Sequence, residues 1–252
     1  MRFLFNINPN ETIFCASDIG WVVGHTYIVY APLLNGSTTV LYEGKPVGTP
    51  NAGVFWRIVN DYNAKAMFTA PTALRAIKRE DDEAQYVTSG GYESGTKGIK
   101  GLQGIFLAGE RSEPTIVSFY QGSSSFFTEL IIELLDKYGA PGALMVDNYW
   151  STELGSPITS IALGAGKPAK LKPGAAGFPL PGMDVRVVDD EGKELPRGIQ
   201  GNVVMKTPLC GTAFRTCWND EEGFERSYFE RFRGKGDWFD TADCKFCFLK
   251  SC

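Results

Sequence analysis

Apolar residues in the first two-thirds of the chain alternate between short runs typical of buried strands and longer stretches with helical spacing. Short apolar or β-branched runs predict strands at 37–44, 64–71, 102–110 and 143–150. Apolar residues that recur every three or four positions predict helices at 49–62, 72–80 and 128–139, the first with Thr49 as its N-cap. Strands that alternate with helices imply an α/β fold with a mostly parallel sheet and flanking helices.

The pattern changes near Gly166. The segment 167–182 is rich in Pro, Gly and Lys, which is typical of a boundary. Beyond it, the apolar positions of 185–188 and 203–205 and the turn residues Asp190-Glu191-Gly192 predict a small antiparallel β unit. We therefore expect an α/β subdomain over 1–165, a small β subdomain over 166–243 and an irregular tail over 244–252.

Composition and charge narrow the classes of partner and the compartments that the sequence allows. The 252 residues carry a formal net charge of -4, which argues against nucleic acid or an anionic membrane as the main partner. No apolar run approaches the ~20 residues that a membrane span needs. The scattered Cys15, Cys210 and Cys217 indicate reduced thiols, so we expect the cytoplasm, with the mitochondrial matrix as the alternative. The C-x-x-C at Cys244 and Cys247 lacks a second ligand pair, which favours an irregular tail over a zinc site.

Single conspicuous residues are first interpreted as structural. His25, in an apolar stretch, is expected to be packed and hydrogen-bonded rather than catalytic. Trp21 and Trp56 are expected in the core, since large aromatic side chains supply much of a protein's buried apolar area. Asp18 is expected to cap a helix.

Two predicted strand ends carry residues suited to chemistry, namely 108–111 and 147–153. In open parallel sheets, ligands bind outside the carboxyl ends of the strands, so neighbouring strands would bring these segments together. Gly109 would let a flat ring approach the backbone, and Tyr149 could stack on that ring. The Thr152 hydroxyl could bind a phosphate oxygen and Glu153 a magnesium ion. This pattern favours a nucleotide site, although the same residues also occur in ordinary loops.

Four further segments give these residues a family context. "CASDIGWVVGHTYIVYAPLLNGSTTVLYEGKP", "FTAPTALRAIKRED", "FLAGER" and "GDWFDTAD", together with "VDNYWSTELGSP", closely resemble the AMP-forming acyl-CoA synthetases. Within that superfamily of adenylate-forming ligases they are most similar to the short-chain acetyl- and propionyl-CoA synthetases. The resemblance implies part of the N-terminal domain of that fold. It also implies an activity in two steps, from carboxylate and ATP to acyl-AMP and pyrophosphate, and then with CoA to acyl-CoA and AMP.

The resemblance also implies roles for individual residues, ATP, Mg²⁺ and CoA as cofactors or co-substrates, and a short-chain carboxylic acid as substrate. Thr152 and Glu153 are the expected catalytic residues, and Glu153 is the expected metal ligand. Asp243 matches the carboxylate that binds the ribose hydroxyls, a task that suits a charged acceptor. The remaining nucleotide-binding positions are Gly109, Glu110, Arg111, Asp147, Asn148, Tyr149, Trp150, Ser151 and Thr152, and the acyl-pocket walls are Val22, Val23, Ala108 and Trp150.

The chain also departs from that family. The Ser/Thr/Gly-rich phosphate loop and the C-terminal lid with its lysine have no counterpart, and the glycine usual before the ribose carboxylate is Ala242. We therefore expect a segment truncated at both ends, whose activity is impaired alone. The alternative is a non-catalytic remnant that binds nucleotide weakly or makes only protein contacts.

Overall fold

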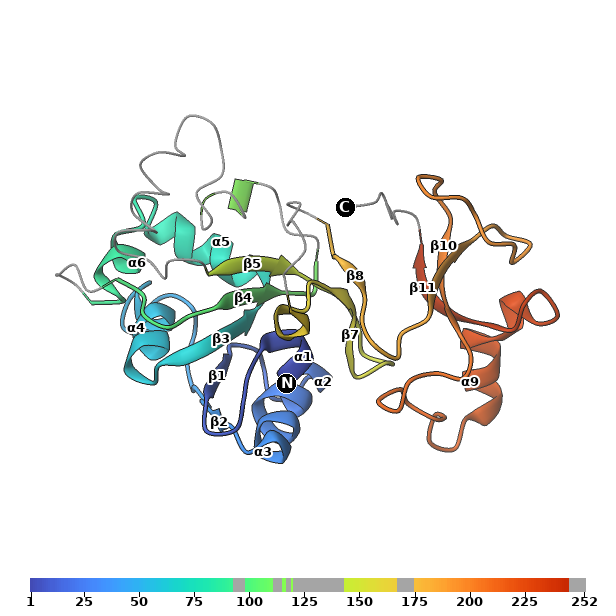
Figure 1. Cartoon of the computed structure of the whole chain (residues 1–252), viewed down its shortest axis with the longest axis horizontal. Helices are drawn as coiled ribbons and strands as arrows, with labels where there is room; N and C mark the ends of the chain where they lie inside the picture. The colour runs from blue at the N-terminus through green and yellow to red at the C-terminus, as the bar shows by residue number, and fades with distance from the viewer. Residues whose placement is uncertain (93–97, 111–114, 117–118, 120–142, 167–174, 245–252) are drawn as a thin grey trace. The chain divides into compact units, whose positions relative to one another are not determined.

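A computed structural model of the chain describes residues 1–92, 98–110, 115–116, 119, 143–166 and 175–244 (Figure 1). The chain forms two compact units, one of Met1–Tyr149 and Ile161–Ala176 and the other of Trp150–Ser160 and Gly177–Cys252. The helix predicted at 128–139 and the tail from 245 lie outside the described residues. The subdomain boundaries predicted from the sequence stay predictions. Among the described residues, no helix has both the length and the apolar character needed to cross a bilayer.

A five-stranded parallel sheet forms the centre of the first unit, in the order β2-β1-β3-β4-β5. This confirms the α/β class predicted from the alternating pattern. The strands are β1 (Thr12–Cys15), β2 (Thr38–Thr39), β3 (Ala64–Thr69), β4 (Gly104–Leu107) and β5 (Leu144–Asp147).

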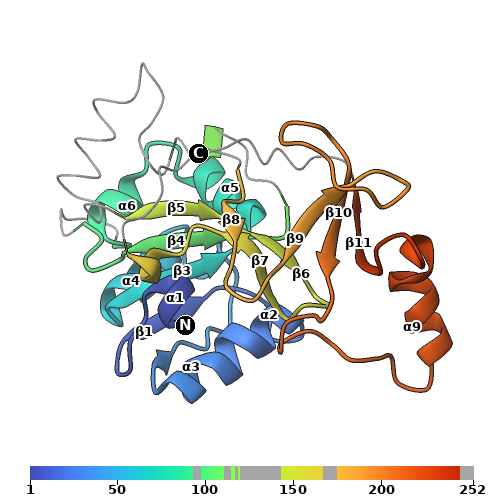
Figure 2. The same cartoon turned by 45° about the vertical axis from the view of Figure 1, so that its right-hand side comes forward.

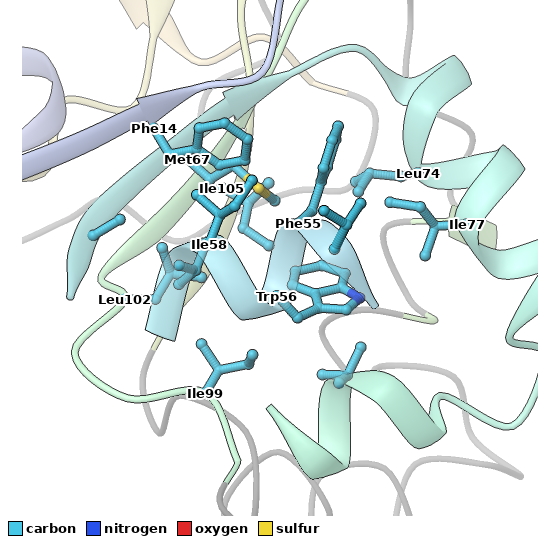
Figure 3. Close-up of a cluster of buried hydrophobic side chains, with 14 of the residues drawn as sticks. Phe14, Phe55, Trp56, Ile58, Met67, Leu74, Ile77, Ile99, Leu102 and Ile105 are labelled. Atoms are coloured by element: carbon cyan, nitrogen blue, oxygen red, sulfur yellow. The ribbon is translucent and has the colours of Figure 1, made fainter. Parts of the chain in front are cut away.

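One face of this sheet packs against three helices, α4 (Val54–Asp61), α5 (Pro71–Glu80) and α6 (Gln85–Ser89). Figure 3 shows Trp56 and Phe55 of α4 among the apolar side chains of this layer. Trp56 is 1% exposed, which confirms its predicted place in the core. Leu74 and Ile77 of α5 are buried in the same cluster, as their spacing predicts.

The opposite face packs against α1 (Arg2–Phe5) and a helical run of α2 (Val22–Gly24), the π-helical turn η1 (His25–Tyr30) and α3 (Ala31–Asn35). The ring of Phe5 lies 4.8 Å from that of Tyr27 and 4.6 Å from that of Phe106 in β4. Phe106 points to the opposite side of the sheet from its neighbours Ile105 and Leu107, which pack in the layer of α4, α5 and α6, as the alternation along a strand requires. Both faces are therefore covered, as is usual for a parallel sheet (Figure 2).

Some local predictions were wrong. The run 37–44 forms only the two-residue edge strand β2, and Leu41 beyond it is 69% exposed. The helix expected from Thr49 begins at Val54, because the Asn51 side chain accepts a hydrogen bond from the Gly53 amide at 3.0 Å and turns the chain there.

Three residues around α2 also differ from their predictions. Trp21 is 66% exposed and His25 is exposed, because both lie on the outer side of a helical run whose inner side carries Tyr27 and Ile28. Asp18 does not cap that run. Its carboxylate accepts from the Gly20 amide at 2.7 Å, in a turn that precedes it.

Burial makes the Cys15 thiol a test of the packing on the face of the sheet that carries Tyr27. Cys15 is 2% exposed at the end of β1, and this burial raises the pKa of its thiol to about 12. Because the thiolate is the reactive form, Cys15 should resist iodoacetamide at pH 9, the ordinary pKa of a thiol, while the half-buried Cys210 and Cys217 react. Peptide mass spectrometry of the native and the urea-unfolded chain checks this. Equal labelling of Cys15 in both states would contradict it.

The same burial predicts a loss of stability at alkaline pH. A folded pKa above the unfolded value means that the native state holds its proton more tightly, so this contribution is intact below about pH 9 and falls as pH rises toward about 12. Tyr27 adds in the same direction, since burial and then the proximity of Cys15 raise its pKa. Urea unfolding at several pH values should show a shallower alkaline decline for Cys15→Ala than for the unchanged chain.

Among its described residues, the second unit contains two small sheets and the helix α9 (Glu221–Tyr228). One sheet has the order β6-β7-β8, with β6 (Tyr149–Ser151), β7 (Ser156–Ser160) and β8 (Phe178–Pro179). The other is antiparallel in the order β11-β10-β9, with β9 (Val185–Val188), β10 (Asn202–Lys206) and β11 (Trp238–Cys244). The antiparallel β structure predicted after Gly166 is therefore present. The run 143–150 is not continuous, since it divides into β5 and β6 at Asn148.

Helix α9 (Glu221–Tyr228) packs its aromatic side chains against β11. Asp220 caps the helix, accepting from the Gly223 amide at 3.0 Å. The Tyr228 ring stacks on Phe239 of β11, with centroids 5.2 Å apart and planes 2° apart. The Phe214 ring contacts the Tyr228 ring edge-on, with centroids 5.0 Å apart. The position of Tyr228 is therefore fixed from two sides.

Ala242 in β11 occupies a backbone conformation that favours glycine. Its φ is 56°, and a left-handed conformation costs an L-residue about 1–2 kcal/mol. After the greater chain entropy of glycine is subtracted, Ala242→Gly should raise the free energy of unfolding by about 0.5–1 kcal/mol. Gly192→Ala is the opposite control in the same unit, since its φ is 79° and an added Cβ would overlap the Lys235 carbonyl oxygen. Urea titration of both variants checks the pair, and destabilisation by Ala242→Gly would contradict the assignment.

Candidate functional site

The two strand ends singled out from the sequence belong to neighbouring strands. β4 pairs with β5 in parallel, and Leu107 at the end of β4 is level with Asp147 at the end of β5. The segments that follow, starting at Ala108 and Asn148, therefore leave the same edge of the sheet side by side. The backbone amide of Asn148 donates to the Leu107 carbonyl at 2.8 Å, which ties the two segments together.

The segment after β4 presents a backbone position that favours glycine and an ion pair. Gly109 has a φ of 103°, which only glycine adopts readily, and a Cβ built there meets nothing within 4 Å. Glu110 forms a salt bridge with Arg75 of α5, and both side chains are partly exposed. Ala108 is buried. Arg111 lies outside the described residues, so its assigned role stays a prediction.

The segment after β5 contains a buried amide with an unused acceptor. Asn148 is 7% exposed, and its Nδ2 donates to the carbonyls of Leu107 at 3.1 Å and Val146 at 3.4 Å. Within the described part of the chain, its Oδ1 receives no hydrogen bond. A buried acceptor without a donor is costly, so this atom is suited to a ligand that brings an N–H group. Tyr149, the next residue, is half-buried.

Two predicted pocket residues follow the carboxyl end of another strand in the same sheet. Val22 and Val23 begin α2, after β1 ends at Cys15, and both are half-buried. Because all five strands are parallel, their carboxyl ends share one edge, and Ala108 follows β4 at that edge. The topology thus places Val22, Val23 and Ala108 on connections that leave the same edge of the sheet.

In the second unit, a tight turn carries Ser151, Thr152 and Glu153. The Leu154 and Gly155 amides donate to the carbonyls of Ser151 and Thr152, at 3.3 and 3.2 Å. Gly155 closes the turn with a φ of 64°. Thr152 is exposed, whereas Trp150 is half-buried and Ser151 is buried. The Phe214 amide donates to the Glu153 carbonyl at 2.8 Å and holds the turn in place.

Two hydroxyl groups orient the Glu153 carboxylate. Ser151 donates to Oε2, and the Tyr228 hydroxyl donates to Oε1 at 3.2 Å. Burial, and next the adjacent carboxylate, raise the pKa of Tyr228, so its hydroxyl keeps its proton and remains a donor. Tyr228 is itself fixed by stacking on Phe239. The carboxylate is therefore held in one orientation while both oxygens keep further lone pairs.

The Glu153 carboxylate is suited to a magnesium ion whose remaining ligands come from substrate phosphates and water. The described residues contain no cluster of three or more acidic, His or Cys side chains that could form a metal cage. Mg²⁺ commonly binds through one or two carboxylates and takes its other ligands from substrate phosphates and water. A single oriented Glu153 meets that requirement.

The last predicted nucleotide residue, Asp243, lies in β11, one position before the end of the strand. Asp147 ends β5 and is half-buried. Sequence patterns gave no signal for two partners that the structure adds, Arg75 beside Glu110 and Tyr228 beside Glu153. Each is 35 or more positions from its partner, and only the fold brings the pair together.

Known proteins match this chain over most of its length. The family model described as AMP-binding enzyme matches residues 1–214. The acyl-CoA synthetase short-chain family member 3, mitochondrial, of Homo sapiens is 40% identical over 243 residues, which are 96% of this chain and 32% of that protein. The acetyl-coenzyme A synthetase of Wolinella succinogenes is 33% identical over 236 residues, 94% of this chain and 32% of that protein. The chain therefore spans about a third of the length of these relatives.

A solved structure shows the same fold. The anthranilate CoA ligase AuaEII, determined in complex with anthranoyl-AMP, superposes with a TM-score of 0.68 and 21% sequence identity. The match covers 96% of this chain and 38% of that one.

Proposed function

Because this chain belongs to the family of AMP-binding enzymes, we propose that it is part of an ATP-dependent short-chain acyl-CoA synthetase. The observation that carries the proposal is the 40% identity to a short-chain acyl-CoA synthetase across 96% of the chain. The chain spans only about a third of that relative, 32%, so the activity of the whole enzyme is part of the proposal.

The proposed reaction has two steps. A carboxylate oxygen of a short acid attacks the α-phosphorus of ATP, and pyrophosphate leaves with the electrons of the broken P–O bond. The CoA thiol, losing its proton, then attacks the acyl carbonyl carbon, and AMP leaves. The first step depends on positioning the reactants and on neutralising phosphate charge. The substrates would be ATP, CoA and a short-chain carboxylic acid, and the compartment one that supplies them, the cytoplasm or the mitochondrial matrix.

The ends of β4 and β5 would bind the adenine. The unused Oδ1 of the buried Asn148 supports this, because the exocyclic amino group of adenine would supply the missing donor. Gly109 offers a backbone without a side chain against which a flat ring can lie. Tyr149 would stack on the ring, with Asp147, Glu110 and Arg111 at its border.

The turn after β6 would bind the α-phosphate and the metal. The exposed Thr152 hydroxyl would donate to a phosphate oxygen, next to Ser151. Glu153 would hold Mg²⁺, which, when bound, neutralises phosphate charge. The hydroxyls of Ser151 and Tyr228 would keep the carboxylate oriented for that task. Asp243 would accept hydrogen bonds from the ribose hydroxyls.

The length of the acid would be set by Trp150 together with Val22, Val23 and Ala108. An indole at position 150 would exclude acids longer than about two to four carbons by steric clash. Acetate and propionate would be discriminated poorly, because one methylene is worth only about 1–3 kcal/mol.

Propionate-dependent exchange of labelled pyrophosphate into ATP tests the proposal, because it reports the first step alone. Exchange that requires propionate and Mg²⁺ and is lost on Asp243→Asn would support it. An absence of exchange together with no stabilisation by a non-hydrolysable propionyl-adenylate would refute it. Stabilisation without exchange would identify the binding-only alternative. That the 252 residues alone turn over slowly stays a prediction.

A further inference from the structure

We infer that Arg231 and Asp240 are positioning residues that fix the backbone carrying Asp243, and thereby set the affinity of the chain for the ribose of its nucleotide. The inference rests on the proposed function, since it deepens the role assigned to Asp243. It is drawn from a bulge in β11 and from the side chains that hold it.

The bulge lies where β11 carries Asp243. On β10, two steps from Asn202 to Val204 are matched on β11 by four steps from Cys244 to Asp240. The strand therefore carries two extra residues between Asp240 and Cys244. Bulges of this kind bend a strand and redirect its side chains, and they are frequent beside active sites. The left-handed φ of Ala242, 56°, is the backbone feature that accommodates the extra length.

Asp240 holds the bulge from its first residue. Its side chain is buried, with 7% of the residue exposed. Its Oδ1 accepts from the Ala242 amide at 2.9 Å, directly before Asp243, and its Oδ2 accepts from Arg231 Nη1 at 3.2 Å. The Thr241 hydroxyl donates to the Val203 carbonyl on β10 at 2.8 Å. Thr241 is therefore tied to β10 through its hydroxyl, and Ala242 is tied to Asp240 through its backbone amide.

Arg231, from the short helix η3 (Glu230–Phe232), links Asp240 at the start of the bulge to the strand residue opposite its end. Its Nη2 donates to Asn202 Oδ1 at 2.9 Å, and Asn202 is the residue opposite Cys244 at the far end. The same Nη2 donates to Asp190 at 2.9 Å. Hydrogen bonds from Asn202 and Arg231 hold the pKa of Asp190 below its usual range, so this anchor stays charged at neutral pH.

The guanidinium is suited to this bridging because its donors have a fixed planar geometry. It contacts Asp240 at the start of the bulge and Asn202 opposite its end, so the backbone at Asp243 is held between two restrained points. A ligand-binding carboxylate gains from such restraint, because little conformational freedom then remains to be lost on binding.

The test compares two ligands that differ only in the groups Asp243 would bind, AMP and 2′,3′-dideoxy-AMP. Affinities are measured by calorimetry on the 252-residue chain, with circular dichroism as a check of folding. Two charge-assisted hydrogen bonds predict that the unchanged chain prefers AMP by at least about tenfold. Asp243→Asn should remove most of this preference.

Arg231→Gln and Asp240→Asn should lower the preference at least about threefold while leaving the affinity for dideoxy-AMP unchanged. Arg233→Gln and Asp184→Asn are matched controls, since each removes a charge from a surface ion pair of the same unit, at 3.0 and 2.8 Å. Both controls should keep the full preference for AMP.

The outcomes separate the inference from the proposed function. Loss of the preference in Asp243→Asn but not in Arg231→Gln and Asp240→Asn would overturn the inference alone. Equal weakening of both ligands by these two variants would also overturn it, since it would show a merely structural role. A chain that binds neither ligand, or binds both equally, would overturn the ribose role of Asp243 and the inference with it.

Discussion

Glu153→Gln is expected to lower the rate of propionate-dependent ATP–pyrophosphate exchange by about 100- to 1000-fold, the loss typical of removing one group that stabilises a charged transition state. Glutamine keeps the size of the side chain but removes the charge that would hold Mg²⁺. Its amide nitrogen would also face one of the hydroxyls that now donate to the carboxylate, from Ser151 and Tyr228. The exchange rate is to be measured over a series of Mg²⁺ concentrations.

Two variants make this measurement specific. Tyr228→Phe removes one donor to Glu153 while its ring can keep the stack on Phe239, so its effect should be smaller than that of Glu153→Gln. Glu191→Gln removes a charge from an exposed turn of the same unit and should leave exchange unchanged. Glu153→Gln with an undiminished rate at limiting Mg²⁺ would show that this carboxylate does not hold the metal.

Trp150→Ala is expected to change which acyl chains the protein accepts. If the indole closes the acyl pocket, its removal admits additional methylenes, and each one buried contributes about 0.8 kcal/mol, or about fourfold in affinity. An octanoyl chain has four more methylenes than a butyryl chain, so the octanoyl-adenylate analogue should gain roughly 200-fold over its butyryl counterpart. Calorimetry with non-hydrolysable acyl-adenylates of increasing length measures this directly.

Trp218→Ala is the matched control, because this tryptophan lies in the same unit and is 92% exposed. It should leave the order of affinities along the series unchanged. If Trp150→Ala preserves the preference for short chains, the acyl pocket is bounded by other residues.

The sequence predicts the strands β3, β4 and β5 of the central sheet because they are short, apolar and separated by helical periodicity, but β1 (Thr12–Cys15) was not predicted. The strands β3 and β4 and the helix α5 lie where their patterns placed them. The run at 37–44 misled, because an apolar pattern does not distinguish a full strand from an edge segment with only two paired residues. The helical run at 22–35 was missed since its apolar residues, including the exposed Tyr30, Leu33 and Leu34, do not lie on one face.

The candidate site divides in the same way. The sequence places Asp147 and Asn148 at the end of a predicted strand. Whether they lie beside the residues that follow β4 depended on the pairing of β4 with β5, which the structure shows. The partners of the site residues did not follow. Tyr228 contacts Glu153 across 75 positions, and Arg231 contacts Asp240 at the start of a bulge that no periodicity in the sequence predicts. Contacts of this kind depend on tertiary packing, which local patterns do not carry.

Calorimetric titration of the 252-residue chain with a non-hydrolysable propionyl-adenylate tests whether these residues form the nucleotide part of an acyl-CoA synthetase. We predict binding of one analogue per chain, weakened at least about tenfold by Asn148→Ala and by Asp243→Asn, each of which removes an acceptor for the nucleoside. Folded protein that binds no analogue, or binds it equally well in all three forms, would contradict the account.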